Sequence, residues 1–188
     1  MIIRREIMLA IKLIFGTLLS LGVFVLFIIA FKVYYKYLLQ ESKCIKKTSG
    51  EVIAYTKISR GPEGSGIHLP IVSYEVSGQQ FKVVGPEFKA FKTYSHSSPI
   101  ETNTIKSCYE KDQVLYIDRS INSHFGLIKN PLAELYPIGT RLDVFYAPDK
   151  PKLAYVQRYC NRKWAFYLTF VTAISLLLTD LLIVILLP

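Results

Sequence analysis

Histidine, cysteine and tryptophan are scarce in this chain of 188 residues, which has three histidines, three cysteines and one tryptophan. The histidines (His68, His96 and His124) lie far apart and have no cysteine or acidic residue at the spacing of a metal-binding motif. Histidines of this kind usually lie on a surface or in a loop. We therefore expect neither a metal site nor a metal cofactor.

Recognisable catalytic and nucleotide-binding motifs are also lacking. The glycine-rich stretch 61–66 does not end in the Gly-Lys-Ser/Thr of a phosphate-binding loop, so it is interpreted as a connection between strands. Ser97, Cys108 and Glu110 do not form a nucleophile–base pattern. These absences favour a non-enzymatic protein with no catalytic residues, no cofactor and no identified small-molecule substrate.

Hydrophobic residues make up 51% of the chain, and they concentrate in two runs, 13–31 and 164–187. The first run has no charged residue, and the second has only Asp180. A helix needs about 20 apolar residues to cross the hydrocarbon core of a bilayer. We therefore predict two transmembrane helices. The first run is longer than the apolar part of a signal peptide and lacks its cleavage pattern, which favours an uncleaved anchor.

The predicted fold class is a membrane α+β protein. Two antiparallel transmembrane helices flank one small, mainly antiparallel β domain of barrel or sandwich type. The expected boundaries are 1–42 for the first helix with an interfacial extension, 43–160 for the water-exposed β domain and 161–188 for the second helix. The corresponding location is the cell (plasma or inner) membrane, in a two-pass topology with the bilayer itself as a partner.

The net charge of +9 is explained by position rather than by nucleic-acid binding. Basic residues cluster beside both apolar runs, where they attract anionic lipid head groups. Aromatic residues join them as predicted interfacial anchors. The anchors after the first run are Lys32, Tyr34, Tyr35 and Lys36, and those before the second run are Arg162, Lys163 and Trp164.

Membrane orientation follows from the basic residues near the helix ends. Eight lie on the domain side (Lys32, Lys36, Lys43, Lys46, Lys47, Arg158, Arg162 and Lys163), against Arg4, Arg5 and Lys12 on the terminal side. This count slightly favours a cytoplasmic β domain. The short N-terminus with Arg4 and Arg5 favours the opposite orientation. If the domain is exported, Cys44 and Cys160 are placed to form a disulfide at its base; in a reducing cytoplasm they are thiols.

Between the apolar runs, the pattern changes to short strands and turns. Strands are predicted over 51–57, 70–76, 80–84, 113–118, 142–146 and 153–156, with a turn at Ser77-Gly78. The hairpin 70–84 draws its apolar face from Ile71, Tyr74 or Val76 and from Phe81, with the register open. Phe88, Phe91 and Tyr94 are spaced at three, which indicates a short amphipathic helix or an irregular loop.

Two stretches resemble the bacterial domain family DUF3592, a domain of unknown function often attached to transmembrane helices. The first comprises Gly50-Glu51-Val52 and residues 70–81, with the pattern Pro-x-Val-x-Tyr-x-Val-x-Gly-x-x-Phe. The second, 136–154, reads Tyr-x-x-Gly-x-x-Leu-x-Val-x-Tyr-x-Pro-x-x-Pro-x-x-Ala, with Leu142 where the family commonly has valine. The resemblance covers about 48–157 and implies a β fold; it brings no catalytic residues.

Asp180 is the main departure from an apolar helix. A carboxylate inside a membrane is costly, and it usually faces protein or water. It lies in a stripe of small polar residues with Thr172, Ser175 and Thr179, while the first helix offers the close-packing pattern Gly16-xxx-Ser20. Since antiparallel helices bring Asp180 towards the level of Lys12, these two residues are expected to pair, or Asp180 meets a neighbouring subunit. The equal alternative is a hydrated Asp180 near the interface.

Three functional hypotheses remain. In the first, the tethered β domain binds or organises a protein partner, or a second copy of the chain, at the membrane. A more specific form is an immunity or accessory protein for a secreted toxin. The third is a subunit of a small oligomeric channel or transporter that uses the polar face of the second helix.

Overall fold

The computed structural model describes residues 2–60, 66–97, 104–122 and 129–186, with side chains from residue 10 to 185 except that of residue 11. The chain divides into two compact units. One contains residues 1–38 and 162–188, and the other contains residues 39–161.

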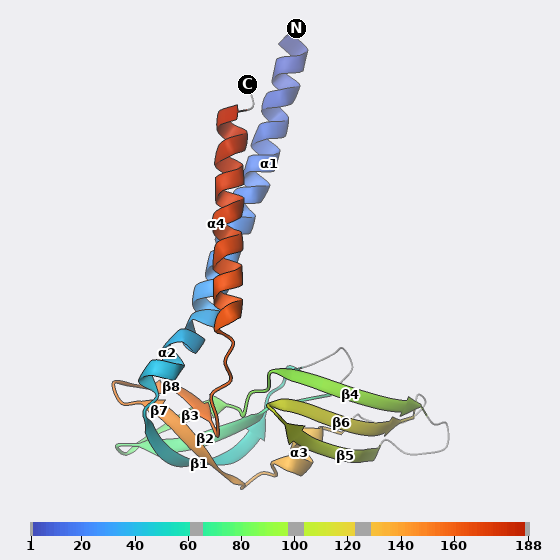
Figure 1. The fold of residues 1–188 in the computed structure, drawn as a ribbon, viewed down its shortest axis with the longest axis vertical. Helices are drawn as coiled ribbons and strands as arrows, with labels where there is room; N and C mark the ends of the chain where they lie inside the picture. Colours follow the sequence, from blue (N-terminus) through green and yellow to red (C-terminus); the bar gives the residue numbers. More distant parts are fainter. Residues whose placement is uncertain (1, 61–65, 98–103, 123–128, 187–188) are drawn as a thin grey trace. The chain divides into compact units, whose positions relative to one another are not determined.

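The first unit is a pair of long helices, which Figure 1 shows side by side with the two chain ends at the same end of the pair. Helix α1 (Ile2–Ile29) continues through a π-helical turn, η1 (Ala30–Tyr34), into α2 (Tyr35–Lys43). The return helix is α4 (Lys163–Leu186). The two helices expected over 13–31 and 164–187 are therefore present, although residue 187 lies outside the described residues. The continuation of the first helix beyond residue 31 is confirmed as well.

Both helices are long and apolar enough to cross a membrane by length and composition. In each, only 11% of the most apolar window is buried within the protein, whereas the core helix of a water-soluble protein would be mostly covered. The exposed surface includes Phe15, Leu18 and Phe24 on α1 and Val171 and Leu182 on α4. Length, composition and exposure therefore agree with what a lipid environment requires.

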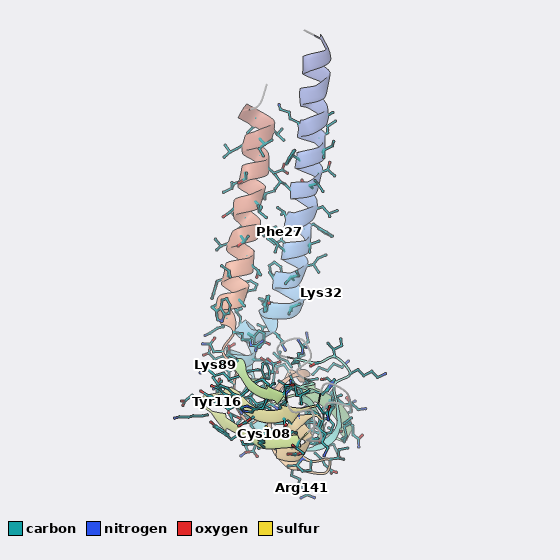
Figure 2. All side chains as sticks on the ribbon, turned by 90° about the vertical axis from the view of Figure 1, so that its right-hand side faces the viewer. Phe27, Lys32, Lys89, Cys108, Tyr116 and Arg141 are labelled. Atoms are coloured by element: carbon teal, nitrogen blue, oxygen red, sulfur yellow. The ribbon has the colours of Figure 1, made fainter. Side chains whose placement is uncertain are left out.

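Small and aromatic residues fill the seam between α1 and α4. Ala30 and Ala173 are completely buried, which lets the helix backbones approach closely. The ring centroids of Phe27 and Phe170 are 5.8 Å apart, and those of Phe31 and Phe166 are 5.7 Å apart, in edge-to-face geometry. Figure 2 labels Phe27 on this helix pair. These contacts pair the end of α1 and the following η1 turn with the first turns of α4, as antiparallel helices require.

The second unit contains a five-stranded antiparallel sheet in the order β3-β2-β1-β7-β8. Its strands are β1 (Lys46–Tyr55), β2 (Pro70–Val76), β3 (Gln79–Val84), β7 (Arg141–Ala147) and β8 (Lys150–Val156). The outer strands β3 and β8 approach each other, so the sheet nearly closes into a barrel. The predicted strands in these regions are confirmed, with shifts of a few residues at their ends.

The hairpin between β2 and β3 turns at Ser77 and Gly78, as predicted. Both residues have positive φ values, 51° and 79°, as a two-residue hairpin turn with the twist of its strands requires. The register places Tyr74 opposite Phe81, with ring centroids 5.8 Å apart. The apolar face therefore contains Tyr74 and Phe81, and it excludes Ile71, which lies on the opposite face of β2.

A second sheet has three strands in the order β4-β6-β5: β4 (Ala90–Ser97), β5 (Thr104–Lys111) and β6 (Val114–Ile121). β6 pairs parallel with β4 and antiparallel with β5. The strand predicted over 113–118 is confirmed. The prediction of a helix or loop around Phe91 and Tyr94 was wrong, because these residues lie on opposite faces of strand β4.

One hydrophobic core joins both sheets of the second unit. It includes Val52, Val72, Val144 and Val156 from the barrel sheet and Leu115 and Ile117 from β6. Leu132 of the short helix α3 (Pro131–Leu135) closes it. Residues 39–161 therefore form one domain around a shared core rather than two independent sheets.

Candidate functional site

Asp180 and Ser20 meet across the helix seam. The Ser20 hydroxyl donates a hydrogen bond of 2.7 Å to Oδ2 of Asp180, whose side chain is only 9% exposed. Gly16 makes room for the carboxylate, because a Cβ at this position would lie 3.3 Å from Oδ1. Three residues singled out from the sequence therefore form one contact.

The second carboxylate oxygen of Asp180 is less well satisfied. Oδ1 is buried and has no hydrogen-bond partner among the described residues. Burial of a polar atom without a partner is unfavourable, and more so in an apolar environment. Among the described side chains of α1 and α4, Asp180 is the buried polar one.

Lys12 does not join this contact. It is half-buried on α1, and the ion pairs of the described side chains include none between Lys12 and Asp180. The reason is the position of the two helices along their common axis. Asp180 packs beside Gly16 and Ser20, and Gly16 lies one helical turn, about 6 Å, beyond Lys12 along α1. The structure thus supplies a serine hydroxyl where an ion pair was expected.

The predicted polar stripe of α4 divides between two sides of the helix. Asp180 faces α1, whereas Thr172, Ser175 and Thr179 are exposed. Thr172 donates to the carbonyl of Leu168 at 2.8 Å, and Thr179 donates to the carbonyl of Ser175 at 2.9 Å. These threonine hydroxyls are satisfied within their own helix, so they do not hold the helix pair together.

The predicted interfacial anchors gather at one end of the helical unit, far along α1 and α4 from Asp180. The Tyr35 ring lies 5.9 Å from that of Phe166, and so the segment 32–36 lies level with the start of α4. Lys32 and Trp164 are exposed, with Trp164 65% exposed. Tyr34, Lys36, Arg162 and Lys163 are half-buried. Figure 2 labels Lys32, which lies in η1, at this end of the helical unit.

The three cysteines are all reduced thiols in the described residues. Cys44 and Cys160 are buried, and the Cys44 thiol donates to the carbonyl of Leu153 at 3.3 Å. Burial raises the pKa of the Cys44 thiol to about 11. Burial, followed by the charge of Glu134, raises the pKa of Cys108 to about 11. Both groups are therefore poor nucleophiles at neutral pH, because the reactive form is the thiolate.

A polar cluster that the sequence did not reveal lies inside the second unit. Arg158, which follows β8, contacts Glu110 of β5 at 2.6 Å, and its guanidinium lies 5.3 Å from the Phe88 ring centroid. Nearby, Tyr136 donates to Gln157 at 3.2 Å. Burial is the main cause that raises the pKa of Tyr136, and Glu110 adds to it. This cluster connects the two sheets, which is a structural role.

The two histidines that the structure describes, His68 and His96, have separate neighbours. Nδ1 of His68 lies 2.6 Å from the Thr56 carbonyl, and Nε2 of His96 lies 3.3 Å from Asp118. His124 and the glycine-rich stretch 61–65 lie outside the described residues. Within the described part of the chain, no three His, Cys, Asp or Glu residues are grouped to hold a metal ion.

Comparison of the chain with protein-family models, with curated proteins and with solved structures finds no match. The resemblance to DUF3592 therefore stays a prediction from the residues quoted above.

Proposed function

We propose that this protein is a non-enzymatic, two-pass membrane protein whose β domain binds or organises a protein partner at the membrane. The observation that carries the membrane assignment is the division of the helix pair. Large apolar side chains cover its outside, while Asp180, the acidic residue within the apolar run of α4, turns inward to Ser20. This is the arrangement that lipid favours, because every exposed polar group in hydrocarbon is costly.

Partner binding is supported by exposed apolar residues on the β domain. Ile58 is 77% exposed, Ile138 is 65% exposed and Tyr94 is 56% exposed. Tyrosine is enriched at protein interfaces, where its ring contributes area and its hydroxyl contributes a hydrogen bond. The raised thiol pKa values of Cys44 and Cys108 argue against nucleophilic catalysis by these cysteines.

Membrane insertion is tested by alkaline carbonate extraction of membranes that contain the full-length chain. We expect the chain to stay in the membrane pellet. Leu18→Lys, which places a charge on an exposed apolar position of α1, should release a large fraction of the chain. Ile45→Lys is the matched control, since Ile45 is also exposed but lies in the second unit. Release of the unmodified chain by carbonate would contradict insertion.

Partner binding is tested by placing a photo-crosslinking residue at Ile58 or Ile138 in native membranes. We expect discrete adducts at one or both positions and none at exposed Lys152. Two differently tagged copies of the chain distinguish a homo-oligomer from a separate partner. Adducts that are equally abundant at all three positions would indicate random collisions and contradict a defined interface.

Orientation is best tested with an introduced cysteine, because the half-buried Cys108 reacts slowly. Lys89→Cys in a Cys108→Ser background gives an exposed reporter. We propose a cytoplasmic domain, and expect labelling by a membrane-impermeant maleimide only after the membrane is opened. Labelling of intact cells would place the domain outside and make a disulfide between Cys44 and Cys160 worth testing.

The alternative of a channel or transporter subunit is favoured by one observation. Thr172, Ser175 and Thr179 lie on the exposed side of α4, where another subunit would meet them. This alternative predicts that Thr172→Val together with Thr179→Val changes ion flux through reconstituted vesicles. Unchanged flux with an intact oligomer would remove it.

A further inference from the structure

Three side chains form a row across the small sheet β4-β6-β5. The register pairs Lys92 of β4 with Tyr116 of β6, and Tyr116 with Tyr109 of β5, so all three side chains lie on one face. The opposite face carries Leu115 and Ile117 into the core. We call these three residues the Lys-Tyr-Tyr row. Figure 2 labels Tyr116 in this sheet.

The Tyr116 side chain has one neighbour from each adjacent strand within the row. On one side, the Tyr109 ring stacks at a centroid distance of 5.2 Å and an interplanar angle of 4°. The Lys92 ammonium lies over the Tyr116 ring, 5.1 Å from its centroid, and donates to the Tyr116 hydroxyl at 3.4 Å. Attraction between a cation and the ring, together with ring stacking, holds the three side chains in fixed positions.

This packing decides which chemistry the row offers. The Lys92 ammonium lies beside the Tyr116 hydroxyl, so the polar ends of these two side chains lie together. The row offers two phenol hydroxyls and one ammonium group, all of which donate hydrogen bonds. The row therefore suits an anionic oxygen group, such as a phosphate.

The exposed charge around the row is positive. Lys111 lies on the same face of β5, and Lys89 precedes β4; both are exposed. Among the described residues, the acidic ones nearest to them along the chain or in the strand register are Glu87, which is half-buried, Asp112, in the turn between β5 and β6, and Asp118, which lies 3.3 Å from His96. The three lysines are exposed, whereas of these three acidic residues only Asp112 is exposed, and Asp118 already has a basic neighbour. A flat surface of this kind attracts an anionic layer.

We propose that the Lys-Tyr-Tyr row binds the phosphate groups of anionic phospholipids. Tyrosine and lysine are the residues that settle at the lipid–water interface, where their polar ends meet head groups. The chain also carries two helices that could cross a bilayer, which keeps head groups at high effective concentration for the domain. The proposal depends on the membrane insertion proposed above, and its test requires no protein partner.

The test uses the full chain in vesicles of phosphatidylcholine, with and without phosphatidylglycerol. A fluorophore on Tyr94→Cys, in a Cys108→Ser background, reports from the exposed end of the same face of β4. Lipids with a spin label on the head group quench it when the face meets the bilayer. We expect quenching to increase when phosphatidylglycerol is present, and a fluorophore on Lys82→Cys in β3 to show a smaller increase.

Variants of the row identify the binding residues. Two variants are compared: the single variant Lys92→Gln, and the double variant Tyr109→Phe with Tyr116→Phe. Each should lose most of the increase in quenching that phosphatidylglycerol causes. Lys152→Gln removes the same charge from exposed β8 and should keep the increase. Equal losses in Lys152→Gln and Lys92→Gln would overturn the proposal, because they would indicate general charge attraction. Melting curves of all variants in detergent confirm that the domain is folded.

Two further measurements separate the alternatives. Inorganic phosphate should not compete with phosphatidylglycerol at equal phosphate concentration; full competition would overturn a lipid site in favour of a free-phosphate site. Polyglutamate added to phosphatidylcholine vesicles tests an acidic protein segment. A Lys92-dependent change with polyglutamate, together with no effect of phosphatidylglycerol, would overturn the proposal. Carbonate extraction of the same samples shows separately whether insertion itself has failed.

Discussion

The Arg158 guanidinium lies 2.6 Å from the Glu110 carboxylate, and this ion pair joins the end of β8 in the barrel sheet to β5 in the small sheet. Both side chains are largely buried, at 23% and 22% exposure. Removal of one member of such a pair leaves the other charge with little solvation. The pair therefore makes the junction of the two sheets sensitive to a single substitution.

We predict that Glu110→Gln destabilises the β domain by about 1–3 kcal/mol, because Arg158 loses its charged partner in a largely buried position. The free energy of unfolding of the full chain in detergent, measured with urea, checks this value. Lys47→Gln is the control, since its ion pair with Asp143 is more than half exposed and should contribute less than about 1 kcal/mol. Equal effects of the two substitutions would contradict the assigned role.

Gly50 of β1 should not tolerate a side chain. A Cβ there would lie 2.6 Å from Cγ1 of Val72 and 2.9 Å from the Ser73 carbonyl oxygen. Since a backbone atom cannot move aside as a side chain can, Gly50→Ala should destabilise the domain by about 1–3 kcal/mol. Thermal unfolding in detergent measures this. Gly22→Ala is the control, because nothing lies within 4 Å of a Cβ there; similar losses for both would contradict the prediction.

The contact between Ser20 and Asp180 should stabilise the helix pair. We predict that Ser20→Ala and Asp180→Ala each weaken helix pairing by about 1 kcal/mol, and that the double variant is no weaker than the worse single one. Energy transfer between dyes at the two helix ends, in detergent of increasing denaturing strength, measures the pairing. Thr172→Ala should have little effect, because the Thr172 hydroxyl bonds within its own helix. Strictly additive losses would show that the two residues act independently.

Stability should fall in alkaline solution. Burial raises the pKa of Cys44 and Cys108 from 9.0 to about 11. Burial, followed by the Cys44 charge, raises the pKa of Tyr74 from 10.0 to about 12. The unfolded chain loses these protons first, so their contribution is complete below the unfolded pKa and is lost as pH rises through the folded pKa.

We therefore expect the melting temperature of the full chain in detergent to fall as pH rises from about 9 to 12. Tyr74→Phe keeps the ring and removes the titrating hydroxyl, and it should make the fall between about pH 10 and 12 shallower. At neutral pH the same variant loses a hydrogen bond to the Pro151 carbonyl and should be less stable. If Tyr74→Phe leaves the slope of melting temperature against pH unchanged, the predicted contribution of Tyr74 is contradicted.

The elements that the sequence predicts share one property: each is recognised from residues that are close together in the chain. The two apolar helices follow from runs of neighbouring residues, and the β2–β3 hairpin follows from alternating strands around Ser77-Gly78. Gly16, Ser20 and Asp180 were recognised because polar or small residues stand out in apolar helices. Strand β4 was not predicted, because Phe88, Phe91 and Tyr94 are spaced at three, which is also the spacing of residues on one face of a helix.

The sequence by itself determined where the apolar helices and the main hairpins form, because hydropathy and turn chemistry act over a few neighbouring residues. Only the tertiary structure decided that Asp180 meets Ser20 rather than Lys12, that Arg158 meets Glu110, and that Lys92, Tyr116 and Tyr109 form a row. The physical reason is that each of these contacts depends on the level and register of segments that are distant in the chain. A shift of one helical turn or one strand position exchanges the partner without changing the hydrophobic pattern.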